Sequence, residues 1–243
     1  MRCLNLIRNL INIFDYFQQK KILNFFKEKF KKELVFFDVG AHHGETVKTF
    51  INKFNIKEMH CFEASPYNFK ILSKNIKKYN IKNNIFLNNL GIGSEKKLAF
   101  LNQTQETSSS TINTFNKNSK YLKKKLKILN VRGLNEYYKK VAIDLITIDE
   151  YLEKKNIKEI DILKIDTEGF EFDVIKGLNL KKNKLVKFIY FEHHYDDMIK
   201  KNYTFSDINT ILIKNGFKKV FKSKMYFRKS FEYIYKNSLF EKF

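Results

Sequence analysis

The sequence has few of the residues that staple or anchor an unusual fold: 2 cysteines, 1 proline, 8 glycines and no tryptophan among 243 residues. Cys3 and Cys61 cannot form a disulfide framework, so we expect a reducing compartment and two small, buried apolar side chains. No run of about 18 uncharged apolar residues occurs, so the sequence predicts no membrane-spanning helix. A chain of this length can bury a sizeable core without help from metals or disulfides.

Arginine is also scarce, although the formal net charge is +21. The basic residues are almost all lysines, with arginine only at Arg2, Arg8, Arg132 and Arg228. Base readout and bidentate phosphate contacts favour the planar guanidinium of arginine. Abundant Lys, Asn, Ile, Phe and Tyr form the pattern of an A/T-rich coding sequence. We therefore interpret the basic surface mainly as composition that favours anionic partners in general, and we do not expect nucleic acid.

Residues 1–32 are predicted to form an amphipathic helical extension to a domain over residues 33–243. Apolar residues recur there at helical spacing at Leu4, Ile7, Ile11 and Phe14. Charges interrupt the apolar stretch and no small-residue cleavage site follows, so it does not resemble a signal peptide. The extension either packs on the domain or a partner, or lies on a membrane surface. We expect a cytoplasmic protein, with peripheral contact at the inner membrane face as the second interpretation.

From Leu34 onward, short apolar runs alternate with amphipathic helical stretches. The runs predict strands over residues 34–38, 59–63, 84–88, 162–166, 186–192, 217–221 and 233–235. Parallel strands need crossover connections, and strands covered on both faces are apolar throughout. The predicted fold is therefore α/β, with a doubly wound, mostly parallel sheet. Residues 102–140 are predicted as a Lys-rich insert beside the site, in which Ser108 to Thr111 form either a flexible linker or a ligand-contacting loop.

Polar residues gather where these predicted strands end, which is where parallel sheets bind ligands. Gly40 and Gly44 permit a tight turn after the first strand, and Glu63 ends the second strand, where a carboxylate can accept hydrogen bonds from both ribose hydroxyls. Asp38 and the missing middle glycine do not suit a pyrophosphate. They suit a cationic cofactor such as S-adenosylmethionine (SAM). A nicotinamide cofactor, or an ordinary turn without a ligand, stays open as an alternative.

Three segments, Phe37–Thr46, Phe62–Pro66 and Leu163–Glu171, resemble the FkbM-type family of SAM-dependent methyltransferases. The resemblance covers residues 34–235 and implies a seven-stranded class I methyltransferase fold, which is Rossmann-like. It also implies methyl transfer to a hydroxyl of a sugar, glycan, glycolipid or similar natural product. The expected cofactor-binding residues are Asp38, Gly40, Ala41, His42, Gly44, Glu63, Ala64, Ser65, Asn89, Leu90 and Asp166.

For catalysis we assign His193 as the general base, because an imidazole accepts protons near neutral pH. Asp166 is the orienting carboxylate, with Glu168 and Glu192 in support; the alternative for His193 is a purely structural role. Adjacent histidines on an extended segment point to opposite sides, so the pairs 42–43 and 193–194 predict no metal site.

We expect an acceptor with anionic groups nearby, steered by lysines of the insert. These are Lys120, Lys123, Lys124, Lys125 and Lys127. The competing hypothesis is a non-catalytic basic protein that binds nucleic acid or an anionic membrane. That hypothesis leaves the acidic strand ends unexplained.

Overall fold

The computed structural model describes residues 18–78, 84–180, 185–225 and 229–240. A helix covers residues 18–29 at the start of this part. The further elements are β1 (Leu34–Val39), α2 (Glu45–Ile51), β2 (Ile56–Phe62), α3 (Pro66–Lys78), β3 (Asn84–Asn88), β4 (Gly91–Ile92), β5 (Lys97–Thr104), α4 (Lys120–Ile128), α5 (Leu134–Tyr137), β6 (Tyr138–Ile146), α6 (Ile148–Lys155), β7 (Ile160–Ile165), α7 (Glu171–Lys176), β8 (Val186–His194), α8 (Phe205–Lys214), β9 (Phe217–Lys224), β10 (Ser230–Asn237) and a 3₁₀ turn, η1 (Ser238–Phe240).

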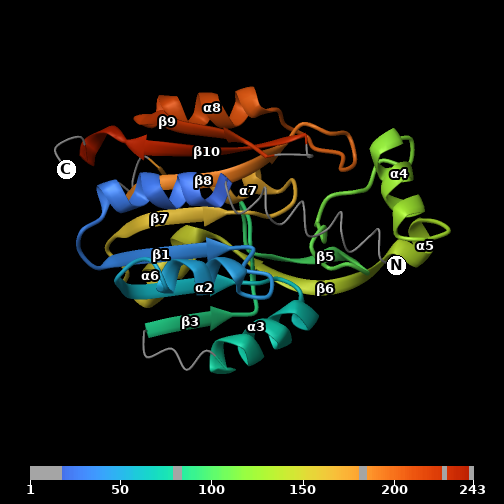
Figure 1. The fold of residues 1–243 in the computed structure, drawn as a ribbon, viewed down its shortest axis with the longest axis horizontal. Coiled ribbons are helices and arrows are strands. Elements are labelled where there is room, and N and C mark those ends of the chain that lie inside the picture. Colours follow the sequence, from blue (N-terminus) through green and yellow to red (C-terminus); the bar gives the residue numbers. More distant parts are fainter. Residues whose placement is uncertain (1–17, 79–83, 181–184, 226–228, 241–243) are drawn as a thin grey trace.

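The main sheet has seven strands in the order β3-β2-β1-β7-β8-β10-β9 (Figure 1). Strands β3, β2, β1, β7 and β8 pair in parallel, whereas β10 is antiparallel to both β8 and β9. The strand order reverses beside β1, because the chain first builds outward to β3 and then crosses back to β7. The predicted doubly wound, mostly parallel sheet is confirmed, and each predicted strand appears within or overlapping an observed one.

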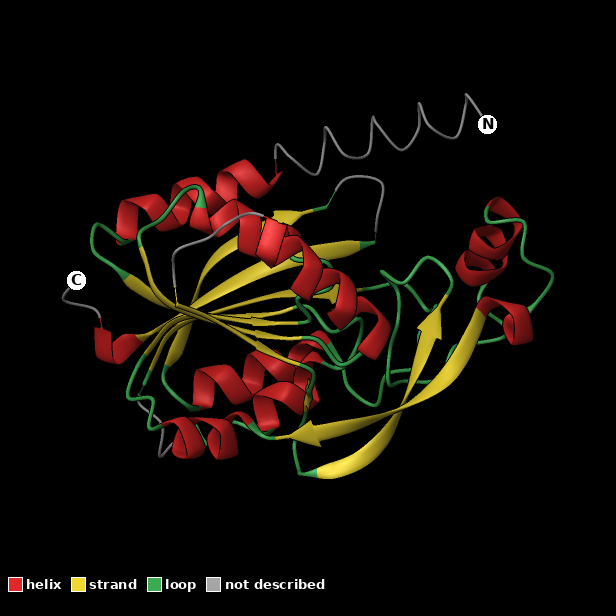
Figure 2. Cartoon of the chain, turned by 90° about the horizontal axis from the view of Figure 1, so that it is seen from below, coloured by secondary structure: helices red, strands yellow, loops and turns green. Residues whose placement is uncertain are grey.

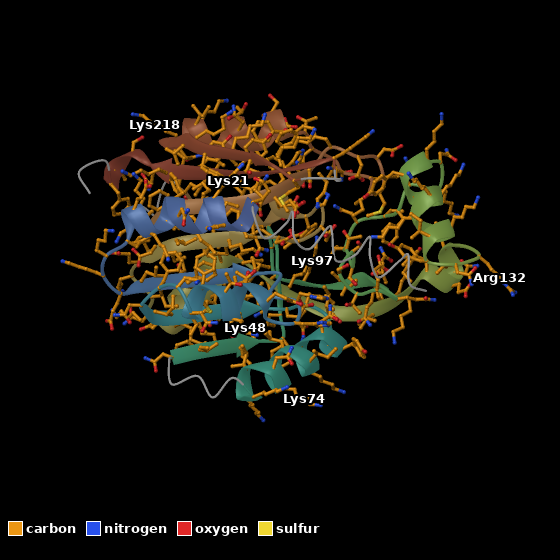
Figure 3. The ribbon with its side chains drawn as sticks, viewed as in Figure 1. Lys21, Lys48, Lys74, Lys97, Arg132 and Lys218 are labelled. Atoms are coloured by element: carbon orange, nitrogen blue, oxygen red, sulfur yellow. The ribbon has the colours of Figure 1, made fainter. Side chains whose placement is uncertain are left out.

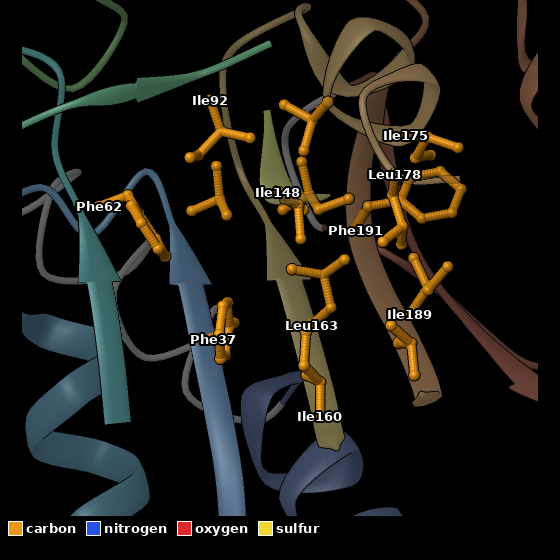
Figure 4. Packing of buried hydrophobic residues seen from close by; sticks show 14 of the residues in the cluster. Phe37, Phe62, Ile92, Ile148, Ile160, Leu163, Ile175, Leu178, Ile189 and Phe191 are labelled. Atoms are coloured by element: carbon orange, nitrogen blue, oxygen red, sulfur yellow. The ribbon is translucent and has the colours of Figure 1, made fainter. Parts of the chain in front are cut away.

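Side chains that alternate along the central strands build a separate core on each face of this sheet. Phe37 of β1 and Leu163 of β7 belong to one core, which α6, α7 and α8 cover (Figures 2 and 4). Phe36 of β1 and Ile162 of β7 belong to the other, which α2, α3 and the helix over 18–29 cover. Burial on both faces explains why these strands are mostly apolar and do not alternate between apolar and polar residues.

A second sheet of three strands, in the order β4-β6-β5, was not predicted. Strand β5 pairs antiparallel with β6, so residues 97–104 lie beside residues 138–145, and α4 and α5 lie at the far end of this pair (Figure 2). The predicted insert over residues 102–140 therefore begins and ends inside two strands that pair with each other. One face of β5 is open to solvent, and Leu98 and Phe100 are 78% and 62% exposed there.

The helix over residues 18–29 packs into the domain core. Ile22 and Phe26 are buried in the same cluster as Leu34 and Phe188, and the Phe26 ring meets the Phe188 ring edge-on at 5.8 Å. This arrangement agrees with the first of the two interpretations of the extension. The helical pattern from Leu4 to Phe14 lies outside the described residues. Within the described residues, no helix is both long enough and apolar enough to cross a lipid bilayer.

Basic side chains are spread around the molecule (Figure 3). The six labelled ones come from six different segments, which range from Lys21 in the first helix to Lys218 in β9. This distribution agrees with the interpretation that the high positive charge mainly reflects composition.

Candidate active site

The loop after β1 touches the loop after β7. Gly40 has a φ of +89°, and a Cβ atom added to it would lie 1.9 Å from the backbone oxygen of Asp166. Only glycine allows both this conformation and this approach. The amides of Gly40 and Ala41 both donate to the carbonyl of Phe62 at 2.9 Å, which fixes the loop against the end of β2.

Glu63, directly after β2, is held by two backbone amides. Its Oε2 accepts from the amide of His42 at 2.8 Å, and its Oε1 accepts from the amide of Ser65 at 2.9 Å. Burial raises the pKa of Glu63 to about 7, against the opposing effect of these two hydrogen bonds. Each carboxylate oxygen can accept a second hydrogen bond, so Glu63 is oriented and still able to bind a ligand.

A pocket opens beside Glu63, among the loops that follow the parallel strands. Seven of the predicted site residues line it: Gly40, His42, Glu63, Ala64, Leu90, Asp166 and Glu168. Apolar walls come from residues that were not predicted, among them Ile92, Leu101 and Phe170. The pocket thus combines polar and charged groups with apolar side chains.

Five predicted cofactor-binding residues do not line this pocket: Asp38, Ala41, Gly44, Ser65 and Asn89. Ser65 is buried and accepts from the amide of Asn68 at 3.2 Å, which makes it the N-cap of α3, as Pro66 in the next position predicts. Asn89 donates to the carbonyl of Glu63 at 2.8 Å. The Ser65 and Asn89 side chains therefore hold the loops in place through hydrogen bonds to the backbone and do not face the pocket.

Asp38 is completely buried and lies next to Lys164 of β7. Its Oδ1 is 3.4 Å from the Lys164 ammonium nitrogen, which also lies 3.2 Å from Oδ2 of Asp166. Burial raises the pKa of Asp38 to about 6, even beside this cation. The expected direct role of Asp38 toward a cationic ligand is therefore replaced by an ion pair inside the protein.

Sequence reasoning left the role of Ser108 to Thr111 open, and the structure places two of these residues and the residue on either side of the segment in the pocket. Thr107, Ser108, Ser110 and Ile112 line it. The segment is tied to the loop after β7, since the Thr111 hydroxyl donates to the carbonyl of Glu168 at 2.8 Å. The run of hydroxyl residues was the available signal, but it did not distinguish a linker from a ligand-contacting loop.

His193 does not lie where a general base was expected. It lines neither this pocket nor the one described next, and its ring packs among Tyr195, Tyr203 and Phe205 at centroid distances of 4.8 to 5.9 Å. Burial lowers its pKa to about 3. The strand continues to His194, so Glu192 and His194 share one face and His193 points to the other.

His42 and His43 also differ from the expectation that adjacent histidines point apart. His42 has a φ of +47°, so the segment is a turn, and the two rings stack at 3.7 Å. With Glu45 they place three donor atoms within 4.8 Å of one another. Other partners already contact these rings: the His42 Nε2 lies 2.8 Å from the Thr107 hydroxyl, and the His43 Nε2 lies 3.3 Å from the Asn68 side chain.

A second pocket, of about 660 Å³, lies on the face of the sheet that carries the helix over 18–29. Its charged and phenolic lining residues are Lys164, Asp166, Tyr190, Glu192 and Glu232. Asp166 lines both pockets. The residue that follows the carboxyl end of β7 is therefore common to the two pockets.

The fold and the paired pockets define a class I methyltransferase architecture. Residues 38–219 match the sequence model of the methyltransferase FkbM domain, so the chain belongs to this family, as its three motifs indicated. SAM is accordingly its cofactor, and the nicotinamide alternative is set aside.

Known relatives are distant. Methyltransferase 1 of Beauveria bassiana is 26% identical over 144 residues, which cover 58% of this chain and 57% of that protein. The chain thus spans little more than half the length of this curated relative. Methyltransferase FkbM from Methylobacillus flagellatus KT superposes with a TM-score of 0.54 at 14% identity, covering 84% of this chain and 44% of that one. TrmK from M. capricolum, solved with S-adenosylhomocysteine, gives a TM-score of 0.51 at 10% identity, covering 88% and 67%.

The residues of the first pocket fit SAM. Glu63 offers an oriented carboxylate for ribose hydroxyls, and Gly40 lets the loop after β1 pack directly against the backbone of Asp166 beside the pocket. Leu90, Ile92 and Phe170 supply apolar surface suited to an adenine ring. These features come from loops that converge at the reversal point of the strand order, where such sheets bind ligands.

Proposed function

We propose that this protein transfers the methyl group of SAM to a hydroxyl group of a sugar, glycan, glycolipid or related natural product. The observation that carries the proposal is that Asp166 lines both pockets, so a cofactor in one and an acceptor in the other would meet at this carboxylate. When bound, SAM supplies an electrophilic methyl group.

The main task of the chain is then to hold two ligands in line, which supplies up to about 7–11 kcal/mol of barrier reduction. Glu63 and the backbone of Gly40 to His42 fix the cofactor. The Asp166 carboxylate, held 3.2 Å from the Lys164 ammonium, accepts the acceptor's hydroxyl proton or a hydrogen bond from it. General-base assistance is typically worth about 10²–10⁴-fold. Asp166 takes the role expected of His193, whose ring faces away, and Glu192 lines the acceptor side.

The test is incubation with methyl-labelled SAM and a panel of hydroxylated acceptors: methyl glycosides, nucleotide sugars and glycolipids. Mass spectrometry and NMR then identify the methylated atom. Asp166→Asn should lower turnover by about 10²–10⁴-fold. The matched control, Asp144→Asn, changes an exposed aspartate of β6 and should leave turnover unchanged. Methylation confined to nitrogen or carbon atoms would refute the proposal.

A further inference from the structure

Lys164, Glu192 and Glu232 line the second pocket, and with Asp38 behind Lys164 they form a row of buried charged side chains that the transfer of a methyl group does not by itself explain. Asp38 pairs with Lys164 across β1 and β7, and Glu192 lies directly opposite Glu232 across β8 and β10. All four lie on the face of the sheet covered by the helix over 18–29. The Lys164 ammonium forms ion pairs with Asp38 and Asp166, whereas the two glutamates face each other.

Two carboxylates directly opposite each other in a sheet are destabilising. Glu192 and Glu232 are only 8% and 6% exposed, and one oxygen of each, Oε1 of Glu192 and Oε2 of Glu232, is buried without a hydrogen-bond partner. The other oxygen of Glu232 accepts from the Tyr190 hydroxyl at 2.5 Å, and the His194 Nε2 lies 3.6 Å from Oε1 of Glu192. Buried polar atoms normally have partners, so Oε2 of Glu232 points to a ligand, while Oε1 of Glu192 faces the His194 ring.

The pair offers both a donor and an acceptor at neutral pH. Burial, followed by the charge of Glu192, raises the pKa of Glu232 to about 8, while Lys164 and the Tyr190 hydroxyl oppose this effect. Glu232 therefore carries a proton at pH 7. A carboxyl group that donates, facing a second side chain with acceptor oxygens, matches hydroxyl groups, because each hydroxyl both donates and accepts.

The remaining walls separate into apolar and hydroxyl surfaces. Ile22 and Leu23 of the first helix, Phe50 of α2 and Met225 after β9 supply apolar area, while Thr46 and Thr49 of α2 supply hydroxyls. A neutral ring with hydroxyls along its edge and carbon–hydrogen bonds on its faces matches this combination. A phosphate or carboxylate would have to lie against Asp166 and Glu192, where like charges repel.

We propose that the second pocket is the acceptor site, and that Glu192 and Glu232 select an uncharged polyhydroxylated ring over an anionic one. This inference rests on the proposed function and replaces the expectation of an anionic acceptor drawn from composition. Residues 18–29 then contribute a wall of the acceptor site.

The experiment measures binding by calorimetry in the presence of S-adenosylhomocysteine, and turnover with labelled SAM. The probes are methyl glycosides of glucose and galactose, with glucuronate, glucose 6-phosphate and glucosamine as charged counterparts. Neutral rings should bind more tightly than the anionic ones. Glu192→Gln and Glu232→Leu should each weaken the binding of the best neutral ring about 10- to 100-fold and leave the affinity for S-adenosylhomocysteine within about two-fold.

Glu28→Gln, at an exposed position of the first helix, is the matched control and should change neither quantity. Thermal unfolding of each variant reports whether it folds. If Glu232→Leu does not fold, the isosteric Glu232→Gln replaces it, because its amide oxygen still accepts the hydrogen bond from the Tyr190 hydroxyl. Tighter binding of an anionic ring or of glucosamine than of any neutral ring overturns the inference. Hydroxyl methylation that is indifferent to both glutamates overturns it while the proposed function stands. If neutral rings bind in a way that depends on the two glutamates but no hydroxyl is methylated, the inference about the pocket is supported and the proposed function fails.

Discussion

Gly40 and Asp166 come from strands that are neighbours in the sheet but far apart in the sequence, and their backbones touch: a Cβ on Gly40 would lie 1.9 Å from the Asp166 carbonyl oxygen. This contact holds the cofactor loop against the residue that lines both pockets. A Cβ atom at position 40 would collide with a backbone atom of Asp166, so no side-chain rotation could relieve the collision.

Gly40→Ala should therefore lower both stability and SAM affinity. The positive φ alone costs about 1–3 kcal/mol for a residue with a Cβ, and the displaced loop should weaken SAM at least 10-fold. Urea unfolding and calorimetry measure the two effects. Gly133→Ala is the control, since no atom lies within 4 Å of its Cβ position and its φ of −179° is ordinary extended backbone. Equal effects of the two substitutions would contradict this account.

Glu63→Ala should weaken SAM about 30- to 1,000-fold, because it removes a buried carboxylate worth about 2–4 kcal/mol to two ribose hydroxyls. Isothermal calorimetry measures this change. Glu63→Gln keeps the shape and one acceptor oxygen, so its loss should be smaller. A folded Glu63→Ala protein with wild-type affinity would show that the ribose lies elsewhere.

The same carboxylate predicts the pH dependence of cofactor binding. Burial raises the pKa of Glu63 to about 7, so in the free protein the accepting, deprotonated form is lost as the pH falls through 7. SAM affinity should therefore rise between pH 6 and pH 8. Glu63→Gln should flatten this profile, because its amide does not titrate. A wild-type affinity that is constant from pH 6 to 8 would argue against a role for this carboxylate.

The sequence was sufficient to predict the central sheet and the cofactor loops, because two-sided burial makes strands such as Leu34–Val39 apolar except for a charged residue near the carboxyl end. It was not sufficient for β5 and β6, where exposed positions carry Leu98, Phe100 and lysines and the alternation is lost in a lysine-rich chain. The position of His193 depended on one further detail. Strand β8 continues past Glu192, and the alternation of side chains decides which of two adjacent histidines faces the pocket.

His193→Phe should leave methyl transfer nearly unchanged and make the protein less sensitive to acid. Burial lowers the pKa of His193 to about 3, so the unfolded chain binds a proton below about pH 6.5 that the folded state does not. Stability is therefore lost as the pH falls from 6.5 toward 3. The variant has no such group and an aromatic ring fits among Tyr195, Tyr203 and Phe205, so its gain over wild type in urea unfolding should grow from pH 7 to pH 5. Loss of turnover in a stable His193→Phe protein would restore the histidine as the base.

Lys164→Met should destabilise the protein strongly at alkaline pH and less at acidic pH. Asp38 is fully buried, and Lys164 is the cation at 3.4 Å from it, so the substitution leaves a buried carboxylate unpaired at a typical cost of about 3–5 kcal/mol. The folded pKa of Asp38, about 6, lies above its ordinary value of 3.8, so its charge already costs stability as the pH rises between these values. Without Lys164 that pKa rises further, and the loss of stability continues to higher pH.

Urea unfolding at pH 5 and pH 8 measures the difference, and the double variant Asp38→Asn with Lys164→Met should recover most of the stability at pH 8. A loss that is the same at both pH values, or a double variant no more stable than Lys164→Met alone, would show that Lys164 stabilises the fold through Asp166 or through packing.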